Sequence, residues 1–191
     1  MLLWVGLGNP EPGMARNRHN IGFMAIDTIA IRHGFTPWRQ RFKGLVSEGS
    51  IAGNKILALK PQTYMNESGA SVQQAAAFYK LTPDTITAFH DELDLVPGKV
   101  RVKRGGGAAC HNGLRSMDRI LGTPDYWRVR LGIGHPGKER VMGHVLGDFV
   151  KQDRDWLLPL LDAVADAAPL LVQGKPEDFM TKVALLARDT K

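Results

Sequence analysis

The sequence opens with the apolar segment Leu2-Leu-Trp-Val-Gly-Leu7, which runs directly into Gly8-Asn-Pro10. A short apolar run that stops at a Gly-Asn-Pro turn is typical of a buried strand followed by a loop. The next stretch, 20–33, repeats small and apolar residues at helical spacing and predicts a helix with one buried face. A strand, a loop and a helix in this order indicate an α/β layered domain.

The alternation of strands and helices continues along the chain. Further strands are expected at 42–51, 55–60, 85–89, 101–104 and 127–133, and further helices at 67–80, 113–121, 151–173 and from residue 176 onward. Pro159 and Pro169 predict kinks or a break in the helix at 151–173, because proline lacks the amide hydrogen of the helical ladder. No internal repeat or long linker divides the chain, so one domain is expected.

Length and composition exclude several classes of protein. The 191 residues, 43% hydrophobic and 23% charged, are enough for one domain with a core. A single cysteine cannot form an internal disulfide, and no apolar run reaches the roughly 20 residues that span a bilayer. The amino-terminal residues show no signal-peptide pattern. We therefore expect a cytoplasmic protein without a membrane segment.

Positive charge is concentrated in one part of the chain. Residues 101–140 hold nine Lys or Arg against three Asp or Glu, which equals the net charge of +6 for the whole chain. A local excess of this kind suits a polyanion, since Lys and Arg at phosphates release condensed counterions. A solvated surface without a partner remains the alternative.

Ligands of open α/β sheets bind beyond the carboxyl ends of the strands, which draws attention to three strand exits. These exits carry Asn9, the run His90-Asp-Glu92 and the pair His111-Asn112. The first exit does not predict a dinucleotide site, because Glu11 stands where the third glycine of G-x-G-x-x-G belongs.

His19 and Asp91 are candidates for a general base and its partner. A carboxylate can fix the tautomer of an imidazole while the other ring nitrogen takes a proton from water. The alternatives are a surface histidine and, for Asp91 with its acidic neighbours Glu92 and Asp94, a metal site or a solvated turn.

Asn9, Asn66 and Asn112 stand at the ends of predicted elements. Their amides could bind a carbonyl, a water or a peptide backbone, whereas helix capping is the plainer explanation for Asn66 and Asn112. Cys110 precedes His111, and adjacent extended residues point to opposite sides, so we expect a small buried thiol and no catalytic pair.

Two pairs of basic residues alternate on predicted strands, and each pair faces one side. Arg101 and Lys103 form one pair, and Arg128 and Arg130 form the other. On neighbouring strands they would make a phosphate clamp, and otherwise they would protect a sheet edge by charge.

Seven blocks of the sequence together closely resemble the bacterial-type peptidyl-tRNA hydrolases, in family order and with near-family spacing. The blocks are Gly6-Leu-Gly-Asn-Pro10, Asn17-Arg-His-Asn-Ile-Gly-Phe23, Lys60-Pro-Gln-Thr-Tyr-Met-Asn-Glu-Ser-Gly69, His90-Asp-Glu-Leu-Asp-Leu95, His111-Asn-Gly-Leu-Arg-Ser116, Arg130-Leu-Gly-Ile-Gly-His-Pro136 and Val145-Leu-Gly-Asp-Phe149. The resemblance implies a single three-layer α/β/α domain over residues 1–191, with a twisted mixed sheet of the phosphorylase/hydrolase-like type and C-terminal helices at about 151–188.

The resemblance also implies a function. Such an enzyme hydrolyses the ester that joins a peptide to the terminal ribose of tRNA, with His19 as general base and Asp91 as its partner. Its expected substrate is the acceptor stem and 3′ end of peptidyl-tRNA, and the enzyme is expected to be a monomer without metal or organic cofactor. Asn9, Met65, Asn66, Asn112 and Met14 would bind the substrate end, and Lys103, Arg130 and Arg101 would bind the tRNA phosphate.

Two positions depart from the family pattern. Met14 replaces a usual aromatic residue of the first loop, and the segment 107–110 reads Gly-Ala-Ala-Cys where the family favours glycine. A relative that binds RNA without catalysis is therefore the second hypothesis. A metal hydrolase that uses His90, Asp91, Asp94 and His111 is the third.

Overall fold

The computed structural model of this chain describes residues 1–188. Within that range seven strands form one sheet in the order β2-β3-β4-β1-β5-β7-β6. The strands are β1 (Leu2–Gly6), β2 (Arg39–Arg41), β3 (Gly44–Ile51), β4 (Asn54–Pro61), β5 (Ile86–Glu92), β6 (Val100–Arg104) and β7 (Trp127–Gly132). The four central strands β4, β1, β5 and β7 are parallel, while β2, β3 and β6 run antiparallel to their neighbours.

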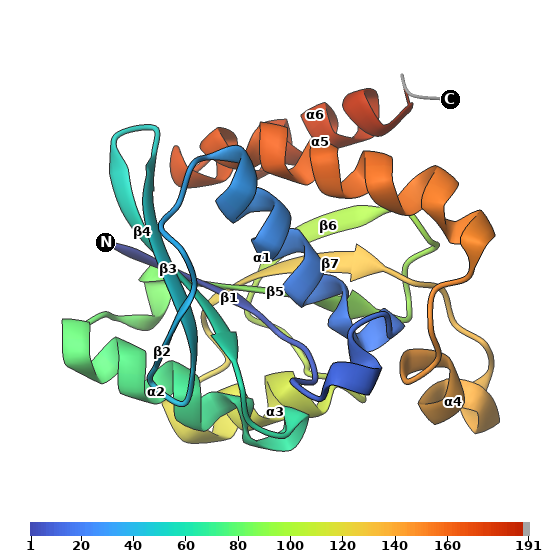
Figure 1. Cartoon of the computed structure of the whole chain (residues 1–191), viewed down its shortest axis with the longest axis horizontal. Helices are drawn as coiled ribbons and strands as arrows, with labels where there is room; N and C mark the ends of the chain where they lie inside the picture. The colour runs from blue at the N-terminus through green and yellow to red at the C-terminus, as the bar shows by residue number, and fades with distance from the viewer. Residues whose placement is uncertain (189–191) are drawn as a thin grey trace.

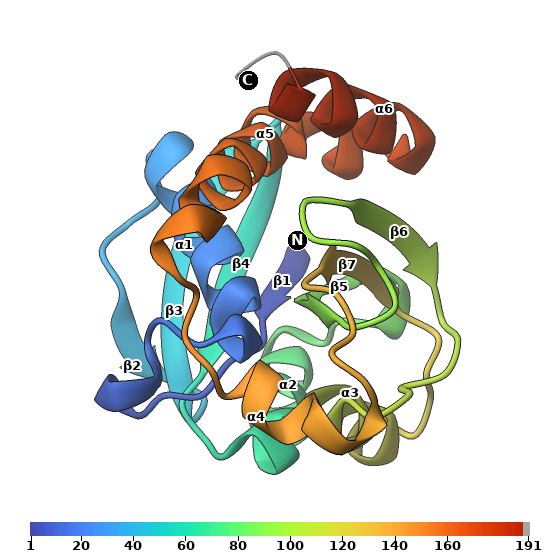
Figure 2. The same cartoon turned by 90° about the vertical axis from the view of Figure 1, so that its right-hand side faces the viewer.

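Helices cover both faces of the sheet and complete three layers, as Figures 1 and 2 show. On one face lie α1 (Ile21–Arg32), α5 (Arg154–Val172) and α6 (Pro176–Arg188), and on the other lie α2 (Ser68–Tyr79) and α3 (Asn112–Leu121). The short helix α4 (Val141–Val145) stands outside these layers (Figure 2). The single-domain α/β fold with a twisted mixed sheet is the predicted one.

The opening strand is buried on both sides, which explains its unbroken apolar run. Trp4 packs with the α1 and α5 side of the core, whereas Leu3 and Val5 pack with the α2 and α3 side. Alternate side chains of one strand thus join two hydrophobic clusters, as expected for a central parallel strand.

The prediction of a break in the penultimate helix is wrong, because α5 continues through both prolines. Pro169 cannot donate to the carbonyl of Ala165, and the ring Nε2 of His33 donates to that carbonyl instead at 2.7 Å. Asp155, whose carbonyl would pair with residue 159, is exposed to solvent. Each proline therefore frees a carbonyl that has another way to be satisfied.

Two short elements, β2 and α4, were not predicted from the sequence. The strand β2 has 3 residues and α4 has 5, too few for a periodic pattern. The last helix does begin at Pro176, with Phe179 and Val183 buried as expected. In the described part of the chain, no helix combines the length and apolar character required to cross a bilayer.

Candidate active site

A cleft of about 530 Å³ lies at the carboxyl ends of the central parallel strands. This is the position at which open α/β sheets bind ligands. The residues singled out in the sequence that line it include Asn9, His19, Met65, Asp91, Lys103, Asn112 and Arg130. One wall is formed by the α4 segment, including Met142 and Leu146.

His19 reaches the cleft because α1 lies very close to the sheet. The residue occupies a 3-10 turn, Arg18–Asn20, that leads directly into α1. A β-carbon on Gly22 would lie 2.2 Å from the carbonyl oxygen of Phe89 and 2.6 Å from that of Leu7. The helix therefore needs glycine at this position to bring its first turn against β1 and β5.

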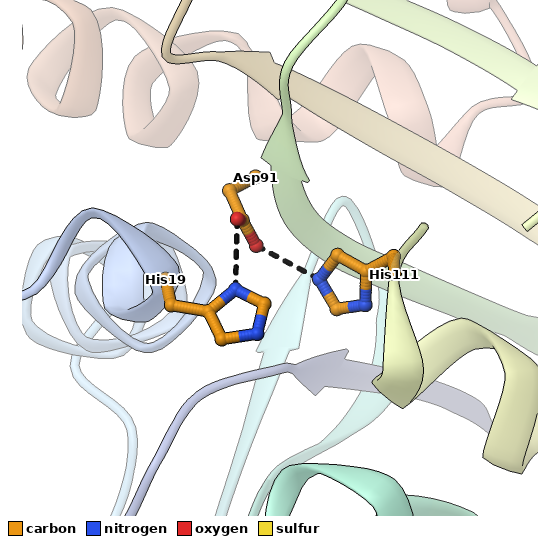
Figure 3. A group of neighbouring side chains, drawn as sticks. All are labelled: His19, Asp91 and His111. Atoms are coloured by element: carbon orange, nitrogen blue, oxygen red, sulfur yellow. Dashed lines mark hydrogen bonds and ion pairs between the residues drawn. The ribbon is translucent and has the colours of Figure 1, made fainter. Parts of the chain in front are cut away.

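Asp91 joins two histidines, as Figure 3 shows. Its Oδ2 lies 2.8 Å from Nδ1 of His19, and its Oδ1 lies 2.8 Å from Nε2 of His111. All three residues are buried, and Asp91 is only 5% exposed. The predicted meeting of His19 and Asp91 is confirmed, and His111 is a third member of the cluster that was not predicted to contact this pair.

The tautomer of His111 follows from its place at the start of α3. Its Nδ1 accepts hydrogen bonds from the backbone N–H groups of Gly113 at 3.1 Å and Leu114 at 3.3 Å. The ring proton must therefore sit on Nε2, which donates it to Asp91. A neutral imidazole in this state offers Nε2 no lone pair for a metal, so His19, Asp91 and His111 do not fit a metal site although they cluster.

Charge and burial set the state of the catalytic pair. Burial alone would raise the pKa of Asp91, but the adjacent rings of His19 and His111 hold this pKa well below its usual range. An ionised Asp91 accepts the Nδ1 proton of His19 and leaves Nε2 of that ring as the basic atom. Burial lowers the pKa of His19, but the charge and hydrogen bond of Asp91 outweigh it and raise this pKa above 6.5.

His90 belongs to the opposite face of β5. Its Nδ1 donates to the backbone carbonyl of Asp91 at 2.8 Å, and the ring is 1% exposed. Burial, with further effects from His111 and neighbouring groups, lowers the pKa of His90 to about 3. The ring is neutral near pH 7, and among the described residues neither it nor the exposed Asp94 belongs to the cluster of His19, Asp91 and His111.

Asn9 is held in place by a residue that sequence reasoning left without a role. The backbone N–H of Asn9 donates to Oδ1 of Asn20 at 2.7 Å, and Nδ2 of Asn20 donates to the carbonyl of Asn9 at 2.9 Å. The amide of Asn20 thus fixes the backbone of Asn9 next to His19. The sequence signal was the adjacency of Asn20 to His19, but only the fold brings it to residue 9.

The helix-capping explanation for the other two asparagines is wrong. The residue that precedes α2 is Glu67, and the N-cap of α3 is His111. Asn66 is an exposed residue of the turn before α2, and Asn112 is the first residue of α3. Within residues 1–188, neither side-chain amide has a hydrogen-bond partner, which leaves both free for a ligand.

Met65 is buried in the cleft, while Met14 lies half-buried in an early turn outside the cleft lining. Cys110 is exposed at the cleft, so the expectation of a buried thiol is wrong. The reason is local: the loop leaves the sheet before α3 and carries this side chain outward.

The two basic pairs lie on neighbouring antiparallel strands, with Arg101 opposite Arg130 and Lys103 opposite Arg128. Arg128 is 0% exposed and pairs with Asp118 at 3.0 Å, so it cannot join a clamp on the surface. Lys103 and Arg130 line the cleft, whereas Arg101 is exposed beyond it.

An imidazole with a free nitrogen, backed by a buried carboxylate in a cleft of an α/β sheet, defines a hydrolase that activates water directly. The sequence profile of the family described as peptidyl-tRNA hydrolase matches residues 3–191. The chain belongs to this family.

Close relatives support this assignment. The chain is 78% identical to the peptidyl-tRNA hydrolase of Acidiphilium cryptum, with 100% of each chain covered. It is 76% identical to that of Granulibacter bethesdensis, with 97% of this chain and 96% of the relative covered. A crystal structure of peptidyl-tRNA hydrolase from Acinetobacter baumannii superposes with a TM-score of 0.89 at 41% identity, over 96% of this chain and 94% of that one.

Proposed function

We propose that this protein hydrolyses the ester between the peptide and the 3′-terminal ribose of peptidyl-tRNA and so releases both for reuse. The observation that carries the proposal is the buried hydrogen bond from His19 Nδ1 to Asp91 at the cleft. The chain thereby has the parts of a water-activating base in a family whose named members act on peptidyl-tRNA.

The chemistry follows from the two ring nitrogens of His19. Asp91 holds the Nδ1 proton, so Nε2 accepts a proton from water while the water oxygen attacks the ester carbonyl carbon. The tetrahedral intermediate collapses by breaking the bond from carbon to the ribose oxygen. The imidazolium returns its proton to that oxygen, which leaves a free ribose hydroxyl and a peptide carboxylic acid that then loses its proton to solvent.

Neutral amides supply the remaining stabilisation. In this proposal Asn9 and Asn112 donate hydrogen bonds to the peptide end and the developing oxyanion, Asn66 binds a peptide carbonyl, and Met65 forms the apolar floor. Met14 takes the place of a substrate-stacking residue without its ring. Because the ester is intrinsically labile, one base and a few fixed amides are sufficient.

 

The basic end of the cleft would hold the tRNA. Lys103 and Arg130 line the cleft, and Arg101 lies opposite Arg130 on β6. These three cations would bind the phosphate at the 5′ end of the tRNA, which lies next to its 3′ end in the acceptor stem. This assigns a role to the basic stretch of the sequence.

We also propose that the protein acts as a monomer in the cytoplasm, where its substrate arises during translation. Light scattering coupled to size-exclusion chromatography, with and without tRNA, would test the oligomeric state. A stable dimer that closes the cleft would contradict this part of the proposal.

The decisive experiment is a single-turnover assay with a peptidyl-tRNA. The wild-type protein should release the peptide, and His19→Asn should lose this activity while its tRNA affinity stays within about twofold, because the asparagine cannot act as the base. A wild-type protein that binds tRNA without hydrolysis would instead support the second hypothesis, a non-catalytic RNA-binding protein.

A further inference from the structure

Glu92 is a carboxylate at the basic end of the cleft, where it contacts Arg130. It ends β5, two residues beyond His90, which is the register partner of Arg130 on β7. Glu92 and Arg130 are therefore diagonal neighbours on the same face of the sheet. Their side chains meet through Nε of Arg130, which donates to Oε1 of Glu92 at 2.8 Å.

The contact leaves the outer edge of the guanidinium free. Only Nε of Arg130 has a hydrogen-bond partner among residues 1–188, so Nη1 and Nη2 remain available as a two-pronged donor. Glu92 is itself held, because its Oε2 accepts a hydrogen bond from the backbone N–H of Asp94 at 3.3 Å. Both side chains are largely buried, at 20% exposed for Arg130 and 13% for Glu92.

The strand on the other side of Arg130 makes such an anchor necessary. Arg101 lies directly opposite Arg130 in the β6–β7 ladder, and like charges in this arrangement repel. Without an acceptor on the β5 side, Arg130 would turn away from its neighbour into solvent. Glu92 Oε1 supplies that acceptor from the side away from β6.

We propose that Glu92 is a positioning residue that fixes Arg130 so that its Nη edge faces the tRNA phosphate. This inference rests on the proposed function, since it takes Arg130 as a phosphate contact. A simple charge argument gives Glu92 no positioning role: a carboxylate in a phosphate-binding cleft should weaken the binding of tRNA, and shortening it with its charge kept should change little.

Two substitutions of Glu92 test the length of its side chain and its charge separately. Glu92→Gln keeps the length and the accepting oxygen but loses the charge, whereas Glu92→Asp keeps the charge and shortens the side chain. We expect Glu92→Asp to weaken the binding of 5′-phosphorylated tRNA about fivefold and Glu92→Gln to bind at least as tightly as wild type. In turnover the Glu92→Asp effect should appear in KM, with kcat within about twofold.

Reference variants complete the design. Arg130→Ala should weaken the same tRNA, and the double variant with Glu92→Asp should bind no more weakly than Arg130→Ala alone. Glu139→Gln is the matched control, because Glu139 lines the cleft but has no ion pair with any described residue. It should not reproduce the effect of Glu92→Asp. A tRNA with a 5′ hydroxyl should abolish the difference between wild type and Glu92→Asp.

The outcomes distinguish the two proposals. If Arg130→Ala leaves tRNA affinity unchanged, the phosphate contact fails and the role of Glu92 fails with it. If Arg130→Ala weakens binding but Glu92→Asp does not, the contact stands and the positioning role is overturned. A loss of affinity in Glu92→Gln with none in Glu92→Asp would also overturn it, because charge and not reach would then be decisive.

Discussion

The two ends of the cleft are built differently. At one end His19, Asp91 and His111 are buried, and their hydrogen bonds fix the proton positions on both rings. At the other end Lys103, Arg130 and Arg101 stand on or beside the edge strand β6, and a single carboxylate holds one of them. The proposed base is thus set by rigid burial, while the proposed phosphate contacts rely on accessible charge. Substitutions at the two ends should therefore separate turnover from affinity.

The largest effect is expected at the buried end. Asp91→Asn replaces the acceptor that holds the Nδ1 proton of His19, so the base loses its favoured tautomer and kcat should fall by about 10²- to 10⁴-fold. The affinity for deacylated tRNA should change little. Single-turnover rates and fluorescence titration would measure the two quantities. If affinity fell as much as rate, the two ends would not be separable.

A smaller effect of the opposite kind is expected at the exposed end. Lys103→Ala should weaken tRNA binding and reduce the slope of log affinity against log salt by about 1, since one phosphate contact is lost. At saturating substrate kcat should be retained. Titrations at several salt concentrations would test this, and an unchanged slope would remove Lys103 from the phosphate contacts.

The pH dependence of kcat tests the buried end of the cleft without altering tRNA affinity directly. The base must be neutral, and Asp91 raises the pKa of His19 above 6.5 although burial opposes this. The acid limb of kcat should therefore lie above pH 6.5, with activity lost as the pH falls through it. In the residual activity of Asp91→Asn the acid limb of kcat should move to lower pH, because burial then lowers the pKa of His19 without an opposing carboxylate. A limb that stays in place would assign it to another group.

The smallest effect is expected in the loop that borders the basic end. Ala109 has a φ of 48°, a left-handed conformation that favours glycine. Ala109→Gly should leave stability unchanged or raise it by up to about 1 kcal/mol, whereas Ala108→Gly, at an ordinary φ, should lower it by about 0.4–1 kcal/mol. Urea denaturation would compare the two. Equal destabilisation by both would show that the strain at Ala109 is not significant.

The sequence predicted the fold because apolar runs and helical spacing located the main elements. The strand exits drew attention to Asp91, but the pair with His19, 72 residues away, was implied by the family resemblance and by no local pattern. His111 was harder, because its role requires one nitrogen at a helix start and the other at a strand end 20 residues away. Likewise, strand register places Lys103 opposite Arg128. The burial of Arg128 depends on its ion pair with Asp118 from α3.

Because α1 packs so closely on the sheet, the geometry of the reaction site depends on the residue at position 22. Even a methyl group there would clash with two backbone carbonyl oxygens, which the sheet holds in place. The first turn of α1 would move away from β5, and the imidazole of His19 would no longer reach the carboxylate of Asp91. A residue with no side chain thus controls the distance between the ring of His19 and the carboxylate of Asp91.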